Sequence, residues 1–287
     1  MSIAVVINNL NHSYGLRPVL NDISVSIFQE DFFIIIGPNG SGKTTLMKIL
    51  AGIEPFQKGR VDILEKPVRH YTKKSLAKII AFVPQTFSID FPYTVKEMVL
   101  MGRYPHQGML GIENEKDRSI AKEAMTITGV EDLADRKLDQ ISGGERQRVT
   151  IARAICQEPR IILMDEPTAS LDLSHQIRIM DLMEQLKTEK GITIVMVSHD
   201  VNLAAMYADR LLILKNGHIV GAGRPAEVLN YDILEKTYGC TIIVDESPLG
   251  KVPRVSPVPL KFIKASRKRN GHFAEKQPDP EDGIPPR

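Results

Sequence analysis

Apolar and polar residues alternate along the first part of the chain. The alternation is loose over residues 3–11 and clear over residues 19–28. A period of two is typical of strands that bury one face and expose the other. Since Tyr14-Gly15 stands between the two segments and glycine favours turns, the pattern predicts an N-terminal pair of antiparallel strands.

A second pattern begins at residue 32. Residues 32–36, 160–164 and 191–197 are largely apolar, which is typical of strands buried on both faces of a parallel sheet. Residues 45–51 have the character of a helix and follow the first of these strands across a glycine-rich loop. A strand, a glycine loop and a helix in this order form the unit of phosphate-binding α/β domains. We therefore expect an α/β fold with a P-loop NTPase core and a mainly parallel sheet.

Between about residues 86 and 158 the β-branched runs disappear, and the chain takes on a helical pattern. We expect this stretch to form a helical subdomain inserted into the α/β core. The clearest helical segments in it are 95–101, 115–128 and 145–155.

The last third of the chain begins with short elements and ends in a polar tail. Residues 211–220 predict a hairpin because Asn216-Gly217 is a strong hairpin signal, and residues 226–229 predict a helix. From Pro248 onward proline and basic residues are frequent. We therefore expect one domain over residues 1–247 and a partly disordered extension over 248–287, whose last ~20 residues bury too little apolar surface to become ordered.

Length and charge narrow the class of protein. With 287 residues, 43% hydrophobic content and a formal net charge of +2, the chain can bury a full core. No apolar run reaches the ~18 residues that cross a bilayer, and the first residues lack the features of a secretory signal, so we expect a soluble protein. Cys156 and Cys240 lack metal-ligand spacing and fit a reducing cytoplasm. The nearly balanced charge gives no bulk attraction to nucleic acid, and we expect no nucleic-acid partner.

The glycine-rich loop matches the pattern G-x-x-x-x-G-K-[ST] in the context that the pattern requires, after a buried strand and before a helix. Its backbone N–H groups and the helix N-terminus can surround the phosphates of ATP. Lys43 supplies a positive charge, and the Thr44 hydroxyl is a candidate ligand of Mg²⁺. The candidate ATP-binding residues of this phosphate loop are Gly37, Pro38, Asn39, Gly40, Ser41, Gly42, Lys43, Thr44 and Thr45.

Polar residues also follow the other strands of the predicted core, at the edge where an open parallel sheet binds its ligand. After the second buried strand, we expect Asp165 to hold Mg²⁺ and Glu166 to activate the attacking water. His199 follows the third buried strand and is a candidate contact for the γ-phosphate. Gln85 lies where the chain passes from the core into the helical lobe. Its side-chain amide is a candidate ligand of the metal or of the attacking water, and at this position Gln85 could also sense movement of the helical lobe.

A second glycine-bearing helix start, which we call the signature segment, lies in the helical lobe at Ser142, Gly143, Gly144 and Glu145. Free N–H groups and a serine hydroxyl make such a helix start an anion site. Because it lies far along the chain from the phosphate loop, we interpret it as the contact for the γ-phosphate of ATP held by a second copy. This interpretation requires a head-to-tail homodimer with two composite sites.

Together these motifs resemble the ATP-binding subunit of an ATP-binding-cassette (ABC) transporter over about residues 3–234, with every family motif in order. The implied fold is the ABC ATPase fold, in which a P-loop core carries an N-terminal antiparallel β subdomain and an inserted helical subdomain. The resemblance further implies that Tyr14 stacks on adenine, that Gln85 couples the two lobes, that Glu166 is the catalytic base and that His199 is a switch residue.

The same resemblance implies an inter-subunit loop at Ser170-Leu171-Asp172. Two departures from the family pattern are mild, because Ile141 replaces the usual leucine before the signature serine and Ser170 replaces an alanine. Neither departure removes a chemical group, so the motifs indicate a site that hydrolyses ATP.

A narrower resemblance connects residues 93–106 and 169–176 with importers of iron siderophores, haem and cobalamin. It implies a peripheral subunit at the cytoplasmic face of the cell membrane that works with polytopic permease subunits and, indirectly, with a substrate-binding protein. An importer of another solute, such as a metal ion, is the alternative. A non-transport ABC ATPase acting on DNA or ribosomes is a less favoured alternative, because such proteins generally have long coiled-coil arms or two cassettes, which this chain lacks. A P-loop kinase is disfavoured because it should lack the signature segment.

Overall fold

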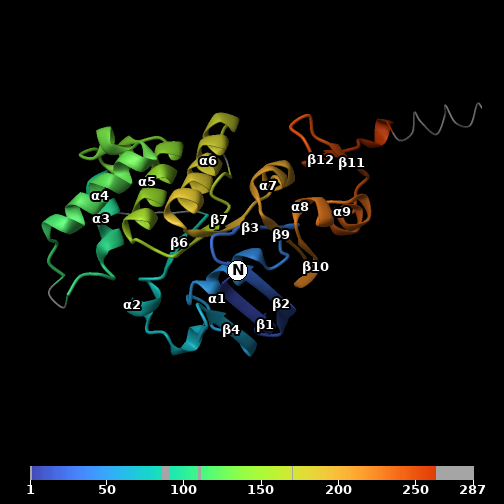
Figure 1. Ribbon diagram of the computed structural model, residues 1–287, viewed down its shortest axis with the longest axis horizontal. Helices are drawn as coiled ribbons and strands as arrows, with labels where there is room; N and C mark the ends of the chain where they lie inside the picture. Colours follow the sequence, from blue (N-terminus) through green and yellow to red (C-terminus); the bar gives the residue numbers. More distant parts are fainter. Residues whose placement is uncertain (1, 86–90, 109–110, 170, 263–287) are drawn as a thin grey trace, which may run out of the picture.

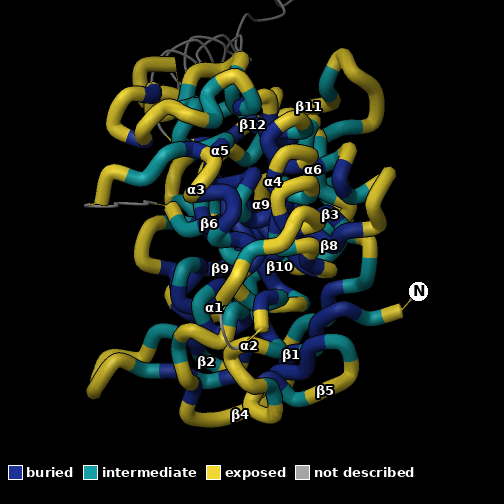
Figure 2. The backbone as a smooth tube through the Cα atoms, turned by 90° about the vertical axis from the view of Figure 1, so that its left-hand side faces the viewer, coloured by how far each residue is buried: buried dark blue, intermediate teal, exposed yellow. Residues whose placement is uncertain are grey.

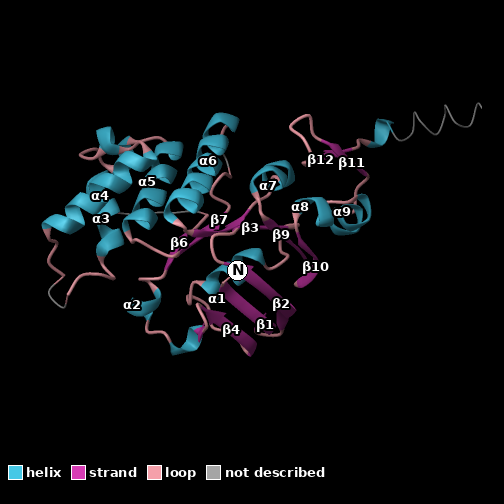
Figure 3. Cartoon of the chain, in the orientation of Figure 1, coloured by secondary structure: helices cyan, strands magenta, loops and turns pink. Residues whose placement is uncertain are grey.

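The computed structural model describes residues 2–85, 91–108, 111–169 and 171–262. The two larger β-sheets and a set of helices form successive layers, with helix α1 between these sheets and most of the longer helices on the far face of the largest sheet (Figures 1 and 3). This arrangement is the α/β fold that the sequence predicts, with a mainly parallel core sheet, an antiparallel β subdomain and an inserted helical subdomain.

The smaller sheet is antiparallel and has the strand order β2-β1-β4-β5. Strands β1 and β2 pair along their whole lengths around a turn after Tyr14, which confirms the predicted N-terminal pair. The other two strands have no counterpart among the sequence predictions. The four strands are β1 Ile3–Tyr14, β2 Arg17–Phe28, β4 Lys58–Ile63 and β5 Lys66–Pro67.

The larger sheet has the strand order β10-β9-β3-β8-β7-β6, in which only β10 is antiparallel to its neighbour. The three predicted buried strands are confirmed as β3, β7 and β8, and the predicted Asn216-Gly217 hairpin joins β9 to β10. The strands are β3 Phe32–Ile36, β6 Ile80–Val83, β7 Ile161–Asp165, β8 Thr193–Val197, β9 Arg210–Lys215 and β10 His218–Gly223.

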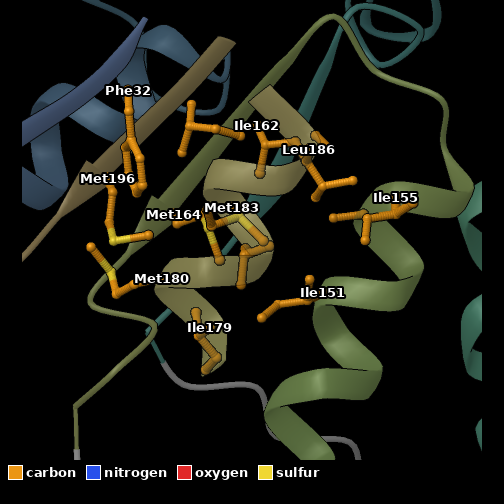
Figure 4. Packing of buried hydrophobic residues seen from close by; sticks show 14 of the residues in the cluster. Phe32, Ile151, Ile155, Ile162, Met164, Ile179, Met180, Met183, Leu186 and Met196 are labelled. Atoms are coloured by element: carbon orange, nitrogen blue, oxygen red, sulfur yellow. The ribbon is translucent and has the colours of Figure 1, made fainter. Parts of the chain in front are cut away.

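Every residue of β3, β7 and β8 is buried because both faces of these strands are covered, and the buried chain runs through the middle of the molecule in Figure 2. Alternate residues point to opposite sides: Phe32 belongs to the apolar cluster under the long helices, whereas Phe33 belongs to the cluster around α1. Figure 4 shows strand residues such as Met164 and Met196 packed against Met183 of α6. Burial on both faces explains why these strands lack polar alternation.

The described residues between β6 and β7 form the helical lobe, and its three predicted helices are confirmed as α3, α4 and α5. Each of the three begins with a capping box, in which a side chain at the helix start and an acidic side chain three residues later satisfy each other's backbone N–H groups. The helical elements of this lobe are α3 Val95–Leu100, η2 Met101–Arg103, α4 Glu115–Thr128, η3 Glu131–Leu133, η4 Leu138–Gln140 and α5 Gly143–Cys156.

The remaining helices belong to the core, and only two of them were predicted from the sequence. The helix expected at residues 45–51 is α1 Lys43–Leu50, and the one expected near residues 226–229 is α8 Pro225–Val228. The helices without a prediction are η1 Val68–His70, α2 Lys73–Leu76, α6 Leu173–Lys190, α7 Val201–Tyr207 and α9 Tyr231–Tyr238.

A two-stranded hairpin, β11 Ile242–Glu246 and β12 Pro253–Pro257, lies near the end of the described chain, which continues to residue 262. The boundary predicted between residues 247 and 248 falls in the loop of this hairpin, between β11 and β12. Ile242 and Val255 are buried in the larger apolar cluster, so the hairpin packs on the core. The expectation of disorder for the last residues of the chain concerns positions outside the described residues.

Candidate functional site

The phosphate loop joins β3 to α1 and depends on glycine at two positions. Gly37 has a φ of 147°, and a Cβ atom there would lie 2.0 Å from the carbonyl oxygen of Leu214. Gly42 has a φ of 103°, and a Cβ atom there would lie 2.7 Å from a methyl carbon of Leu20. Because both the backbone angle and the available space exclude a side chain, these glycines hold the loop in its wrapped conformation.

Lys43 is the buried cation of the phosphate loop, with a side chain that is only 5% exposed. Its Nζ donates hydrogen bonds to the carbonyl oxygens of Gly37 at 2.8 Å and Pro38 at 2.9 Å. Burial lowers the pKa of Lys43, and the nearby carboxylates of Glu166 and Asp165 partly offset that effect. A cation held by neutral carbonyl groups is well placed for a polyanionic ligand.

Asp165 and Thr44 form a pair of oxygen ligands beside the loop. The Thr44 hydroxyl donates to Oδ1 of Asp165 at 3.2 Å, and Asp165 is 2% exposed. Burial raises the pKa of the Asp165 carboxyl above its usual value, and the charge of Glu166 adds to this increase. A hydroxyl and a carboxylate are hard oxygen donors, so this pair fits Mg²⁺ bound together with phosphate oxygens.

Glu166 contacts two other predicted site residues. Its side-chain oxygens contact Nε2 of Gln85 and Nε2 of His199, so residues that follow β6, β7 and β8 come together at one edge of the sheet. Glu166 has a φ of 53°, a left-handed conformation that costs a non-glycine residue free energy. Its N–H donates to the Val197 carbonyl at 3.2 Å, which ties the strained residue to the neighbouring strand.

Residues 39–45 of the phosphate loop, together with Gln85, Glu166 and His199, line a cavity of about 690 Å³. Tyr14 lies at its side and is 46% exposed, with its ring edge-to-face against His12 at a centroid distance of 4.7 Å. Arg17 and Asn216 also line the cavity, although sequence analysis did not select them. A signal for Asn216 existed, because it begins the predicted hairpin turn.

The signature segment lies beside a different cavity, of about 470 Å³. The Ser142 hydroxyl accepts the N–H of Glu145 at 3.3 Å, and the Glu145 carboxylate accepts the N–H of Ser142 at 2.7 Å, so the segment caps α5 by itself. Ser142, Gly143 and Gly144 line this second cavity and the phosphate loop lines the first, while Gln85 and Glu166 line both. Within one chain, the two predicted phosphate contacts therefore face separate spaces.

Asp172 caps helix α6 and lines the second cavity. Its carboxylate accepts the backbone N–H of His175 at 2.9 Å and contacts Nδ1 of the same residue at 2.8 Å. These hydrogen bonds hold the pKa of Asp172 well below its usual range. The rest of the predicted inter-subunit loop includes Ser170, which lies outside the described residues.

A third cavity, of about 500 Å³, lies at the junction of the core and the helical lobe, and Ile53, Phe82 and Gln157 are among its lining residues. The Gln157 carbonyl contacts Nε2 of His106 at 2.8 Å. Tyr104, two residues before His106, is 57% exposed, and Ile53 is 58% exposed. His106 of the predicted segment at residues 93–106 therefore contacts Gln157, which lines the third cavity, and Tyr104 exposes an aromatic ring two residues away from that contact.

Comparison with known proteins supports one family. The sequence profile described as ABC transporter matches residues 20–169. The chain is 38% identical to the ferric enterobactin transport ATP-binding protein FepC of Escherichia coli, over 87% of this chain and 92% of FepC. It is 40% identical to the hemin import ATP-binding protein HmuV of Thermobifida fusca, over 87% of each chain. It is also 40% identical to YvrA, an ABC transporter ATP-binding protein of Bacillus subtilis, and covers 57% of that longer protein.

Solved structures agree with the sequence comparison. The chain resembles a metal-chelate type ABC transporter solved in an inward-facing conformation, with a TM-score of 0.81 and 28% identity over 91% of this chain and 100% of that one. It also resembles an ATP-binding cassette solved as a dimer with ADP and Pi, with a TM-score of 0.69 and 32% identity over 77% of this chain and 98% of that one. Among the described residues, no helix is long and apolar enough to cross a membrane.

Proposed function

Because the chain belongs to the ABC transporter family of ATP-binding proteins, we propose that it hydrolyses ATP to ADP and phosphate and thereby energises an importer. The observation that carries this proposal is the contact of Glu166 with both Gln85 and His199, in a cavity that also contains Lys43 and the phosphate loop. Phosphoryl transfer to water needs a positioned base, polar groups that orient the water, and a loop that binds the phosphates.

Each of these residues has a defined task in the proposed reaction. The loop N–H groups and Lys43 bind the phosphates of ATP, and Tyr14 stacks on the adenine ring. Glu166 accepts a proton from the attacking water. Gln85 and His199 contact Glu166 and help to orient this water. Thr44 and Asp165, with Gln85 beside them, would hold Mg²⁺, which neutralises phosphate charge when bound.

We further propose that the working unit is a homodimer. Helix α5 presents Ser142 and Gly143 exposed at its start, at a cavity that the phosphate loop does not line. A second copy in head-to-tail orientation can supply ATP to this helix start. A related cassette solved as a dimer with ADP and Pi supports a unit of two copies. Each of the two sites then needs both chains.

The proposed cargo is an iron(III) siderophore, haem or a corrinoid. FepC and HmuV, two relatives that match most of this chain, are named for ferric enterobactin transport and hemin import. The chain itself would bind to the cytoplasmic side of permease subunits and would never contact the cargo, which a separate substrate-binding protein delivers. Coupling then depends on the lobes of this subunit changing position with the state of the nucleotide.

The permease is proposed to dock a helix at the junction of the core and the helical lobe. Ile53 exposes apolar surface in the junction cavity, which is large enough to accept side chains of a partner. Tyr104 is exposed two residues before His106, which contacts Gln157 of the same cavity. Phe82 lines this cavity and lies in β6, only three residues before Gln85. A helix docked at this point therefore lies close to a residue that contacts the catalytic glutamate.

Reconstitution with the natural permease tests the proposal. ATP-dependent uptake of labelled siderophore, haem and cobalamin is measured beside phosphate, amino-acid and zinc controls. We expect uptake of at least one of the three chelates and of none of the controls. Uptake of a control alone would contradict the substrate class, whereas absence of ATP hydrolysis in the complex would contradict the catalytic assignment.

Docking is tested by substituting one exposed tyrosine at a time. Tyr104→Ala should weaken co-purification with the permease by about ten-fold, because exposed aromatic residues often dominate an interface, while nucleotide binding stays unchanged. Tyr231, which is 46% exposed in α9, provides the matched control as Tyr231→Ala. Equal co-purification of the two variants would refute the proposed docking surface.

A further inference from the structure

The C-terminal hairpin packs against the helix that follows His199. Strand β12 lies in contact with α7, and Figure 1 shows β11 and β12 beside that helix at one edge of the molecule. Val255 of β12 and Ala204 of α7 belong to the same buried apolar cluster. A segment that is distant in sequence from the ATP-binding motifs is therefore fixed next to one of them.

Asn202 joins the two elements by a two-point contact. Its Nδ2 donates a hydrogen bond to the Val255 carbonyl oxygen at 3.1 Å, and its Oδ1 accepts the Val255 N–H at 2.8 Å. The side-chain amide thus pairs with the backbone as a neighbouring strand would. Because Val255 is 9% exposed, loss of this amide would leave backbone groups with little access to water.

The contact is made within the first turn of α7, three residues after His199. Asp200 caps this turn by accepting the N–H groups of Asn202 at 2.8 Å and Leu203 at 2.9 Å. On the other side of His199, the Ser198 N–H donates to the Ile35 carbonyl of β3 at 3.1 Å. His199 therefore lies between a fixed strand end and a helix start that the hairpin holds.

The far end of α7 has its own anchor. The Tyr207 hydroxyl donates to Oδ1 of Asp181 in α6 at 2.7 Å, and the Tyr207 ring lies 6.4 Å from that of Phe32. Loss of the Asn202 contact would leave this end held and would weaken the hold on the end next to His199. A pivot of the first turn would move the histidine away from Glu166, which it contacts through Nε2.

We propose that the C-terminal hairpin, acting through Asn202, positions His199 for ATP hydrolysis. The inference rests on the proposed function, since it assigns a support to one of its site residues. Asn202 is a positioning residue: it is absent from the residues that line the nucleotide cavity and acts only through α7. Hydrolysis depends steeply on the placement of such groups, whereas nucleotide binding depends mainly on the phosphate loop and Tyr14.

Three full-length variants test the proposal by ATPase kinetics. Asn202→Leu removes both hydrogen bonds at similar volume, and Asn202→Asp keeps the acceptor but loses the donor. Arg254→Ala is the matched control, because it breaks the exposed cross-strand pair with Asp245 in the same hairpin. We expect kcat to fall about ten-fold in Asn202→Leu and less in Asn202→Asp, with KM for ATP nearly unchanged and Arg254→Ala close to wild type.

A second readout separates positioning from general destabilisation. The imidazole NMR signal of His199, assigned by its loss in His199→Ala, should shift in Asn202→Leu and stay in place in Arg254→Ala. In the His199→Ala background, Asn202→Leu should cause no further loss of activity. An unmoved His199 signal, or the same fold-loss in both backgrounds, would overturn the inference. The proposed function would instead be overturned if the wild-type chain did not hydrolyse ATP, or if Lys43→Ala hydrolysed ATP as fast as wild type.

Discussion

The phosphate loop and the signature segment are both glycine-bearing helix starts, yet they are built differently. Lys43 and Ser41 of the phosphate loop are 5% and 2% exposed, and the loop is wrapped around its own lysine. The signature segment caps its helix with its own Glu145 and leaves Ser142 and Gly143 exposed. The phosphate loop is therefore closed around its own lysine, whereas the signature segment is an exposed helix start that we propose binds the nucleotide of a second copy.

In the proposed homodimer, this difference means that one chain binds ATP at its phosphate loop while a second copy completes the site. The phosphate loop shares one cavity with Glu166 and His199, and its Thr44 hydroxyl donates to Asp165, so the proposed mechanism places nucleotide binding and proton transfer in one half of the site. The signature segment faces another cavity, and in the proposed homodimer it contributes only when a second copy brings its nucleotide. Substitutions in the two regions should therefore fail in distinct ways.

The largest expected effect concerns chemistry in the phosphate-loop half. Glu166→Gln should lower kcat about 10³-fold because it removes the positioned base while keeping the size of the side chain. ATP should still bind, since Lys43 and the loop are intact. Single-turnover hydrolysis and equilibrium binding of labelled ATP measure the two properties, with Glu189→Gln on the surface of α6 as control. Wild-type turnover in Glu166→Gln would remove this residue from the mechanism.

A mixture of two inactive chains tests the signature half. Lys43→Ala should lose phosphate binding, and Gly143→Asp should place a negative charge at the anion site without a clash, because no atom lies within 4 Å of a Cβ at Gly143. Heterodimers retain one site made of unaltered halves, so the mixture should hydrolyse ATP about ten-fold faster than either variant alone. If the mixture shows only the average of its parents, the two halves do not act in trans.

Loss of the proposed adenine contact should weaken ATP binding moderately and leave the rate of hydrolysis unchanged. Tyr14→Ala is expected to raise KM for ATP about ten-fold and leave kcat unchanged, because aromatic stacking on a base contributes ~1–3 kcal/mol. Tyr14→Phe keeps the ring and should resemble wild type. Steady-state kinetics of both variants decide the matter, and a fall in kcat with unchanged KM would contradict the stacking role.

The smallest expected effect is on stability. Burial raises the pKa of Asp165, so the folded state binds this proton more tightly than the unfolded state does. The contribution of Asp165 to stability is therefore lost as pH rises above the unfolded value of 3.8, and the ionised carboxylate destabilises the nucleotide-free fold at neutral pH. Asp165→Asn should raise Tm by a few degrees at pH 7, and the difference should shrink as pH falls. A lower Tm at pH 7 would contradict the assigned sign.

Elements could be predicted from the sequence where their local residue pattern has a single physical explanation. Strands β3, β7 and β8 are apolar because both faces are buried, and the phosphate loop needs glycine where Leu214 and Leu20 leave no space. The meeting of Gln85, Glu166 and His199 could be expected, since all three follow parallel strands. Their roles in catalysis remain predictions.

Elements with mixed patterns escaped prediction. Helix α6 buries Ile179, Met183 and Leu186 on one face, a helical spacing that was present in the sequence but lay among many charged residues. Strand β12 begins and ends with proline, which is tolerated in a short hairpin but resembles a tail in sequence. The Asn202 contact with Val255 joins residues distant in sequence, so no local pattern could indicate it.

Mass measurement of the trapped protein tests the two-copy site most directly. Glu166→Gln in excess ATP and Mg²⁺ is examined by multi-angle light scattering, beside the same variant carrying Gly143→Asp. If ATP is held between two chains, the single variant should have twice the mass of the 32.1 kDa chain and the double variant should remain a monomer. A monomer of Glu166→Gln with ATP bound, or a dimer that Gly143→Asp leaves intact, would contradict the account.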